Sequence, residues 1–324
     1  MMKRICLLFL ALGVAAMLPG CGDNTAPKKL RLVFVGGTPD NYWSVVRLGC
    51  DFATRQLPDV DLDFRYLENG TTPAQQELLN ALVTNGVDGI AISPIDPASQ
   101  TDFLNKIAAT TVLVCADSDA VQSKRQCYIG TDNIAAGAQA AELLKAALPQ
   151  GGKIVLFISY ANAENTKDRI QGIQNGLSGS NIQIIEAMVD GAASDIAQKN
   201  AEDALTKYPD LVGMACLNGY QGPAVLTAVR HAGKSGQVKI VCFEDYGATL
   251  DGIANGDIFG TIVQNPLKIG FQTIFRLERY LHGDKSQFGD GKVLIPSLEI
   301  TKSNLADYLA VQKNVLLQTQ AGNP

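Results

Sequence analysis

Short apolar runs of strand length alternate with segments of helical spacing along most of the chain. The first apolar run covers residues 32–35, and an unbroken run of this length is typical of a strand covered on both faces of a parallel sheet. Gly36 and Gly37 end the run, and Asp40 or Asn41 then stands at a helix N-cap position. The positions that follow recur at helical spacing: Val45, Gly49, Phe52 and Gln56. The pattern predicts a strand, a turn and a helix, and in open α/β sheets such turns bind ligands.

The same alternation predicts two similar halves. The first half contains further predicted strands over 60–67, 87–92, 111–116 and 128–129, with helices over 73–85 and 98–109. The second half contains predicted strands over 153–158, 182–188, 211–216, 238–243 and 259–263, with helices over 132–148, 166–177, 194–208, 222–232 and 250–255. A helix over 267–281, a last strand over 293–300 and a terminal helix over 303–318 follow. This order indicates an α/β fold with two doubly wound, parallel-sheet domains.

Residues 1–21 have the architecture of an export signal, with two basic residues ahead of an apolar stretch over 5–18. That stretch is short for a permanent membrane helix. The tetrapeptide LPGC that ends at Cys21 resembles a bacterial lipobox, in which the cysteine carries the lipid, although its proline stands where a small residue is usual. An ordinary secretory signal with a chance cysteine is the alternative. Residues 22–29 are predicted to be a short polar tether.

Charge and cysteine spacing exclude several classes of protein. The formal net charge is −5 and no basic run occurs, which argues against a nucleic-acid partner. The seven cysteines show no C-x-x-C spacing of a zinc site or a redox pair. Cys115 and Cys127 are the one pair close enough in sequence to suggest a disulfide, whereas the alternative is that both are small buried residues.

Two polar groupings have only weak functional signals. Asp59, Asp61 and Asp63 are spaced like the start of a calcium loop, but Phe64 occupies the place of the turning glycine, so we expect them on one face of a strand. His231 and His282 both stand near predicted helix ends, where a surface position is the default.

Seven stretches in a fixed order carry a resemblance to a known family. They are PDNYW at 39–43, GVDGIAISPID at 86–96, VCADSD at 114–119, YIGTDNIAAG at 128–137, LNGYQGPAVLTAVRHAG at 217–233, VCFEDY at 241–246 and ANGDIFGTIVQNPLKIG at 254–270. The set resembles the periplasmic sugar-binding proteins of ribose-binding type, whose fold also forms the ligand-binding half of the lac-repressor family. The resemblance covers the chain from Leu30 to about Ile300.

In that family, two Rossmann-like domains joined by three crossings close over one small molecule. The resemblance implies crossings near Thr131-Asp132, near Gln264-Asn265 and near Asp290. It therefore implies a first domain of residues 30–131 plus 265–290 and a second of 132–264 plus 291–324. Closure of this kind is a hinge motion that a ligand stabilises by touching both domains.

The resemblance also implies site residues in the first domain. A sugar is a ring of hydroxyls with an apolar face, so its site needs flat side chains together with charged or amide groups. The matching positions are Asp40, Tyr42, Trp43, Ser93 and Asp117. The alternatives are a core role for one of the two aromatics, a turn role for the serine and a solvated loop position for Asp117. Ser118 stands where the ribose binder has arginine, which argues against ribose itself.

In the second domain, the family supplies a basic side chain from a helix, for which Lys167 is the matching residue and Arg169 the second candidate. The two lie about 200° apart on a helix, so at most one faces the cleft. The alternative for either is a solvated surface residue. The other matching positions are Asn218, Phe243, Glu244 and Gln264. Glu244 is longer than the aspartate usual in the family.

Together these features predict a lipid-anchored, exported receptor that captures a monosaccharide or related polyol and delivers it to the permease subunits of an ABC importer. No Ser-His-Asp or Cys-His arrangement and no phosphate loop is visible, so we expect neither an enzyme nor a cofactor. We also expect a monomer. The alternative is a sensory binding protein, for a sugar-like or nucleoside ligand, that reports to a membrane kinase or chemoreceptor.

Overall fold

A computed structural model describes residues 29–320 and contains two six-stranded sheets. The first sheet consists of β1 (Leu30–Val35), β2 (Val60–Arg65), β3 (Gly89–Ile92), β4 (Val112–Ala116), β5 (Cys127–Gly130) and β11 (Lys292–Leu294). The second consists of β6 (Gly152–Ile158), β7 (Ile182–Val189), β8 (Leu211–Cys216), β9 (Lys239–Phe243), β10 (Gly260–Val263) and β12 (Leu298–Thr301). We call the first sheet with its helices the first lobe, and the second sheet with its helices the second lobe.

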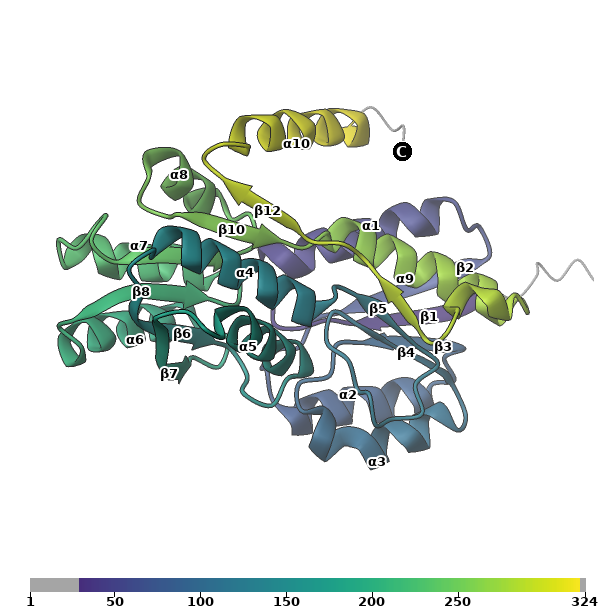
Figure 1. The fold of residues 1–324 in the computed structure, drawn as a ribbon. Helices are drawn as coiled ribbons and strands as arrows, with labels where there is room; N and C mark the ends of the chain where they lie inside the picture. The colour runs from purple at the N-terminus through teal and green to yellow at the C-terminus, as the bar shows by residue number, and fades with distance from the viewer. Residues whose placement is uncertain (1–28, 321–324) are drawn as a thin grey trace, which may run out of the picture.

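Helices cover both faces of each sheet, and the two lobes lie side by side in Figure 1. In the first lobe, α1 (Asn41–Arg55) and α9 (Pro266–Leu281) pack on one face, while α2 (Thr72–Thr84) and α3 (Pro97–Ala108) pack on the other. In the second lobe, α4 (Asn133–Ala147) and α5 (Glu164–Leu177) oppose α6 (Ser194–Lys207), α7 (Gln221–His231) and α8 (Gly247–Asn255). The 3₁₀ helix η1 (Lys285–Phe288) and α10 (Leu305–Gln320) complete the described chain. None of the described helices is long and apolar enough to cross a membrane.

The two sheets repeat one topology. Their strand orders are β11-β5-β4-β3-β1-β2 and β12-β10-β9-β8-β6-β7, so β1, β3 and β4 correspond to β6, β8 and β9. All pairs are parallel except β10 with β12. Buried residues form a core cluster on each face of each sheet. The predicted α/β fold with two doubly wound sheets is therefore confirmed.

The end of the chain differs from its prediction. The single strand predicted over 293–300 is two strands in different sheets, because β11 pairs with β5 and β12 pairs with β10. Pro296 stands between them, and proline has no backbone N–H to donate to a sheet. The third crossing consequently covers 295–297 and not the neighbourhood of Asp290, which places the whole of β11 in the first lobe.

The suggested disulfide does not form. Cys115 and Cys127 are both buried and free in the structure. In the pairing of β4 with β5, Cys127 lies opposite Val114, so Cys115 is offset by one residue. Because successive side chains of a strand point to opposite faces, the two thiols enter different core clusters.

Candidate functional site

A cavity of about 270 Å³ lies between the lobes, at the carboxyl ends of the parallel strands. The first lobe lines it with the turns after β1, β3 and β4, and the second lobe with the turns after β6, β8, β9 and β10. Eight of the ten predicted ligand-binding residues line this cavity: Asp40, Tyr42, Trp43, Ser93, Asp117, Asn218, Glu244 and Gln264. The repeated topology thus brings residues that are distant in sequence to one place.

The turn after β1 is shaped around Trp43. Asp40 is the N-cap of α1, and its carboxylate accepts the backbone N–H of Trp43 at 2.8 Å. The indole packs so closely on the preceding turn that a Cβ added to Gly37 would lie 2.4 Å from its Nε1. Trp43 also belongs to the core cluster under α1 and α9, so it combines the core role and the cavity-lining role that the sequence left open.

Asp117 is the centre of a hydrogen-bond network in the first lobe. It follows β4 with φ of 67°, a left-handed conformation that is uncommon for a residue other than glycine. Its carboxylate accepts the hydroxyl of Tyr42 at 2.8 Å and the hydroxyl of Ser93 at 2.9 Å. Asn165 of the second lobe donates to the same carboxylate at 3.3 Å. This buried acid therefore has its orientation fixed from both lobes.

Glu244 is the counterpart of Asp117 in the second lobe. It follows β9, the strand that corresponds to β4, and its φ is 69°. The side-chain amide of Gln264 donates to its Oε1 at 2.6 Å, and the backbone N–H of Gln264 donates to its Oε2 at 3.3 Å. Gln264 stands at the second crossing, directly before Asn265, which caps α9. The second buried acid is thus tied to the crossing itself.

Arg169, and not Lys167, is the basic residue that reaches the cavity. The side chain of Lys167 is 44% exposed and pairs with Glu164 at 3.9 Å, outside the cavity lining. Arg169 is 2% exposed and lines the cavity. The expectation that only one of them faces the cleft is confirmed, but the preference for Lys167 is wrong. The helix buries the face that carries Thr166, Arg169 and Ile173.

The guanidinium of Arg169 is held on three sides. Its Nε donates to Asn133 Oδ1 at 2.9 Å, and its Nη1 donates to the carbonyl of Leu217 at 2.5 Å. The ring of Phe243 lies beneath it, with 4.4 Å from ring centroid to Cζ. Nη2 has no hydrogen-bond partner among the described residues. Phe243 therefore packs against the guanidinium of Arg169 and does not itself line the cavity.

The described site holds more acid than base. Burial raises the pKa of Asp40 and of Asp117 above their usual range, and raises that of Glu244 to about 7. Arg169 opposes the effect of burial on the pKa of Asp117 and of Glu244. Asp117 also raises the pKa of Glu244, because two like charges in a buried site repel each other. Hydroxyl groups that donate hydrogen bonds to these carboxylates would favour their ionised forms.

Side-chain contacts between the lobes span the cleft. Three hydrogen bonds cross it: Tyr246 to Asp40 at 3.2 Å, Asn165 to Asp117 at 3.3 Å and Asn162 to Asp96 at 3.2 Å. The hydroxyl of Tyr160 approaches Gly70 so closely that a Cβ there would lie 1.7 Å away. The structure therefore holds the two lobes in contact across the cleft.

The sequence does not single out several residues that line or bridge the cleft, among them Tyr160, Asn165 and Tyr246. Tyr160 lies in the turn directly after the apolar strand β6, and the carboxyl ends of parallel strands are where open α/β sheets bind ligands, so this position does carry a signal in the sequence. Asn165 lies in the first turn of α5 and Tyr246 directly before α8, where the sequence alone gives no comparable signal.

Comparisons with known proteins agree with this architecture. A family model described as a periplasmic binding protein domain matches residues 32–285. The chain belongs to the periplasmic binding protein family.

The chain is 27% identical over 251 residues to the fructose import binding protein FruE of Bifidobacterium longum. The match covers 74% of this chain and 73% of that protein. The chain is 23% identical to a D-ribose/D-allose-binding protein of Pseudomonas aeruginosa, covering 66% and 72%. A crystal structure of an ABC transporter solute binding protein from Burkholderia graminis, in complex with D-arabinose, is 26% identical with a TM-score of 0.80, covering 86% and 97%. These likenesses confirm the predicted resemblance to the ribose-binding type.

Proposed function

We propose that this periplasmic binding protein captures a monosaccharide or a related polyol between its two lobes. The observation that carries the proposal is the cluster of Asp117, Glu244 and Arg169, buried in one cavity with contributions from both lobes. The names of the relatives support the same ligand class, since they report fructose, ribose, allose and arabinose.

The chemistry of the cavity suits a neutral polyhydroxylated molecule. Carboxylates accept hydrogen bonds from hydroxyls, and the free Nη2 of Arg169 and the amide of Asn218 can donate to hydroxyl or ring oxygens. Tyr42 and Trp43 supply aromatic surface for an apolar ring face. A volume of about 270 Å³ is at the small end of ligand pockets, which favours one sugar ring over an oligosaccharide.

We further propose that the hinge is formed by the three crossings and that the ligand stabilises the closed arrangement. The crossings at 131–132, 264–265 and 295–297 connect lobes that otherwise meet through a few polar contacts across the cleft. A ligand bridging Asp117 and Glu244 would add contacts that exist only when the lobes are together. The proposed lobe boundaries follow these crossings.

Delivery of the sugar to an ABC importer completes the proposed function, with no chemistry performed by the chain itself. The relatives named as import binding and ABC transporter solute binding proteins support this role. Cys21, the proposed point of lipid attachment, lies outside the described residues. A lipid there would hold a monomeric receptor at the outer face of a membrane, beside its permease subunits.

Thermal unfolding against a panel of pentoses, hexoses, polyols and nucleosides tests the ligand class. A ligand at a hundred times its Kd should add about 2.7 kcal/mol to the free energy of unfolding. We expect a shift with at least one sugar or polyol. A shift with nucleosides alone would refute the sugar assignment.

Two variants on the same helix test the site. Arg169→Met removes a donor inside the cavity and is expected to cut the ligand stabilisation to about half or less, because a hydrogen bond to a charged group contributes about 1.5–3 kcal/mol. Lys167→Met removes the same charge two residues away, on the exposed side of α5, and should leave the shift intact. Equal shifts in the two variants would place the sugar elsewhere.

A further inference from the structure

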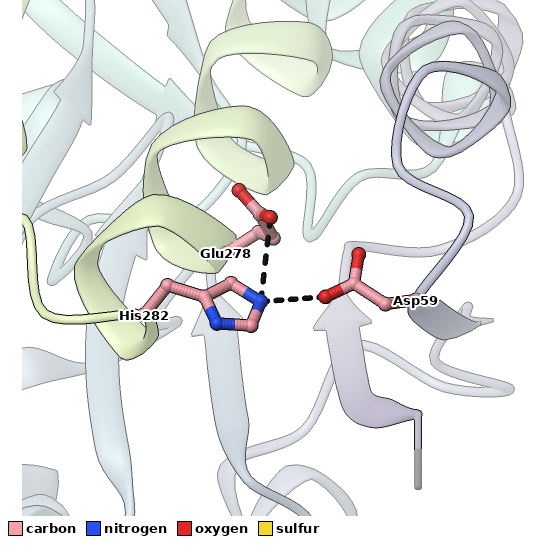
Figure 2. A group of neighbouring side chains, drawn as sticks. All are labelled: Asp59, Glu278 and His282. Carbon is pink, nitrogen blue, oxygen red and sulfur yellow. Dashed lines mark hydrogen bonds and ion pairs between the residues drawn. The ribbon is translucent and has the colours of Figure 1, made fainter. Parts of the chain in front are cut away.

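A second group of polar side chains lies in the first lobe, far from the cleft. Asp59, just before β2, meets Glu278 and His282 at the end of α9, and the three side chains point toward one another in Figure 2. Each offers one ligand atom, and these atoms lie within 4.8 Å of one another. Asp59 precedes its strand, whereas the cavity lies at the carboxyl ends of the strands. The group therefore lies at the opposite end of the strands from the cavity.

The backbone fixes the positions of all three residues. Glu278 and His282 are four residues apart, and the backbone N–H of His282 donates to the carbonyl of Glu278 at 3.0 Å, so both side chains lie on one face of the last helical turn. The carbonyl of Asp59 accepts the N–H of Leu30 at 2.7 Å, which ties Asp59 to the start of β1. The helix therefore fixes the backbone of Glu278 and His282, and the sheet fixes the backbone of Asp59.

Both carboxylates converge on a single ring nitrogen. Nε2 of His282 lies 2.5 Å from Asp59 Oδ2 and 3.5 Å from Glu278 Oε1. A hydrogen on Nε2 can be directed at only one of the two oxygens, so a proton satisfies one carboxylate and leaves the other. A metal ion bound to this nitrogen would contact both.

Glu278 is the residue that this arrangement leaves unexplained. It is only 9% exposed, and its Oε2 has no hydrogen-bond partner among the described residues. The ion pair with His282 is the one that the described structure gives it. A buried carboxylate without hydrogen bonds is costly, and buried charges in proteins are ordinarily paired or coordinate metals.

We propose that Asp59, Glu278 and His282 bind a divalent transition-metal cation such as Zn²⁺. Ligand atoms of a tetrahedral zinc site lie about 3.4 Å apart, as follows from metal–ligand distances of about 2.1 Å. Glu278 Oε1 is already at this distance from His282 Nε2, whereas Asp59 Oδ2 would have to move away from Nε2 by about 1 Å. The half-exposed side chains of Asp59 and His282 leave room for water as a further ligand.

The donor set decides the class of cation. Imidazole nitrogen suits zinc, copper and nickel, whereas calcium and magnesium prefer oxygen ligands alone. Two carboxylates balance the charge of a divalent ion. Such an ion would join the end of α9 to the start of β2 within the first lobe, and would leave the sugar cavity untouched.

Titration of the purified, metal-free chain with Zn²⁺ and with Co²⁺ tests the site. We expect saturable one-to-one binding by calorimetry, a visible Co²⁺ absorption band, and a rise in Tm of about 5 °C when Zn²⁺ is a hundredfold above its Kd. His282→Ala and Asp59→Asn should each lose the Co²⁺ band and the Tm rise. Either change affects a partly exposed side chain, and far-UV circular dichroism will verify that both variants fold.

The chain contains one matched control. His231→Ala removes its other histidine, which is exposed at the end of α7, and should leave binding unchanged. Binding that survives in His282→Ala, or a Kd weaker than about 1 mM for both ions, would overturn the proposal and leave a histidine–carboxylate ion pair only. Equal affinity for Ca²⁺ and Zn²⁺ would overturn it too, because the imidazole would then contribute nothing.

Discussion

Glu244 is expected to make the stability of the free protein depend on pH. Burial raises its pKa in the folded protein from 4.5 to about 7, so between these values the folded state binds more protons than the unfolded chain. The stabilisation is full below pH 4.5 and is lost as the pH rises through 7. Between pH 8 and pH 6, protonation of this one group should raise the free energy of unfolding by about 1.4 kcal/mol.

The affinity for a sugar should change in the opposite direction. A sugar hydroxyl that donates to Glu244 favours the ionised carboxylate, so ligand binding lowers its pKa. At pH 6 only about a tenth of the free protein carries this ionised group if the pKa is about 7, whereas at pH 8 nearly all of it does. We therefore expect the Kd to weaken about tenfold from pH 8 to pH 6, while the free protein becomes more stable.

Calorimetric titration and urea unfolding at pH 6, 7 and 8 measure the two effects on one sample. Glu244→Gln should remove the contribution of Glu244 to the pH dependence of both the Kd and the free energy of unfolding. Glu202→Gln, on the exposed face of α6, should keep it. A Kd that varies less than twofold over this range, or a pH dependence identical in the protein and in Glu244→Gln, would refute the assignment of Glu244 as a titrating ligand contact.

Two further substitutions test the first lobe. Asp117→Asn should weaken sugar binding by about 10- to 150-fold in calorimetry without lowering Tm, because the amide can keep partners such as Tyr42 while the burial of a charge is relieved; a Tm several degrees lower would contradict this. Gly37→Ala should lower the free energy of unfolding in urea by about 1–3 kcal/mol, because its Cβ would clash with Trp43. Gly247→Ala adds a Cβ that meets no atom within 4 Å and should leave the free energy of unfolding nearly unchanged, and equal losses in the two variants would show that the clash with Trp43 is not the cause.

The periodicity of the sequence predicts most of the fold because both sheets are buried on two faces. Strands such as β1 and β9 contain continuous apolar runs, at 32–35 and 240–243, and the helices between them carry apolar residues at helical spacing. The last strand was mispredicted for the same reason. Apolar residues occur on both sides of Pro296, and hydrophobicity does not reveal that the two segments belong to different sheets.

The cavity residues were predictable because parallel strands place their carboxyl ends together. Asp117, Asn218 and Glu244 each follow a buried strand, and all three line the cavity. The phase of α5 explains why Arg169, and not Lys167, faces the cavity. Arg169 is four residues before Ile173, a buried position, so the apolar stripe itself indicates which basic residue turns inward. Contacts between the lobes, such as Tyr246 with Asp40, depend on how the lobes meet, which local sequence does not encode.

The repeated topology gives the strained positions of Asp117 and Glu244 a common cause. Each follows the fourth strand of its half, and their φ angles are 67° for Asp117 and 69° for Glu244. Such a backbone costs about 1–3 kcal/mol in a residue other than glycine and persists where the surrounding structure requires it. Glycine would remove the strain at either position but would also remove the carboxylate. The presence of an acid at both equivalent turns therefore favours a role in the cleft over a role in stability.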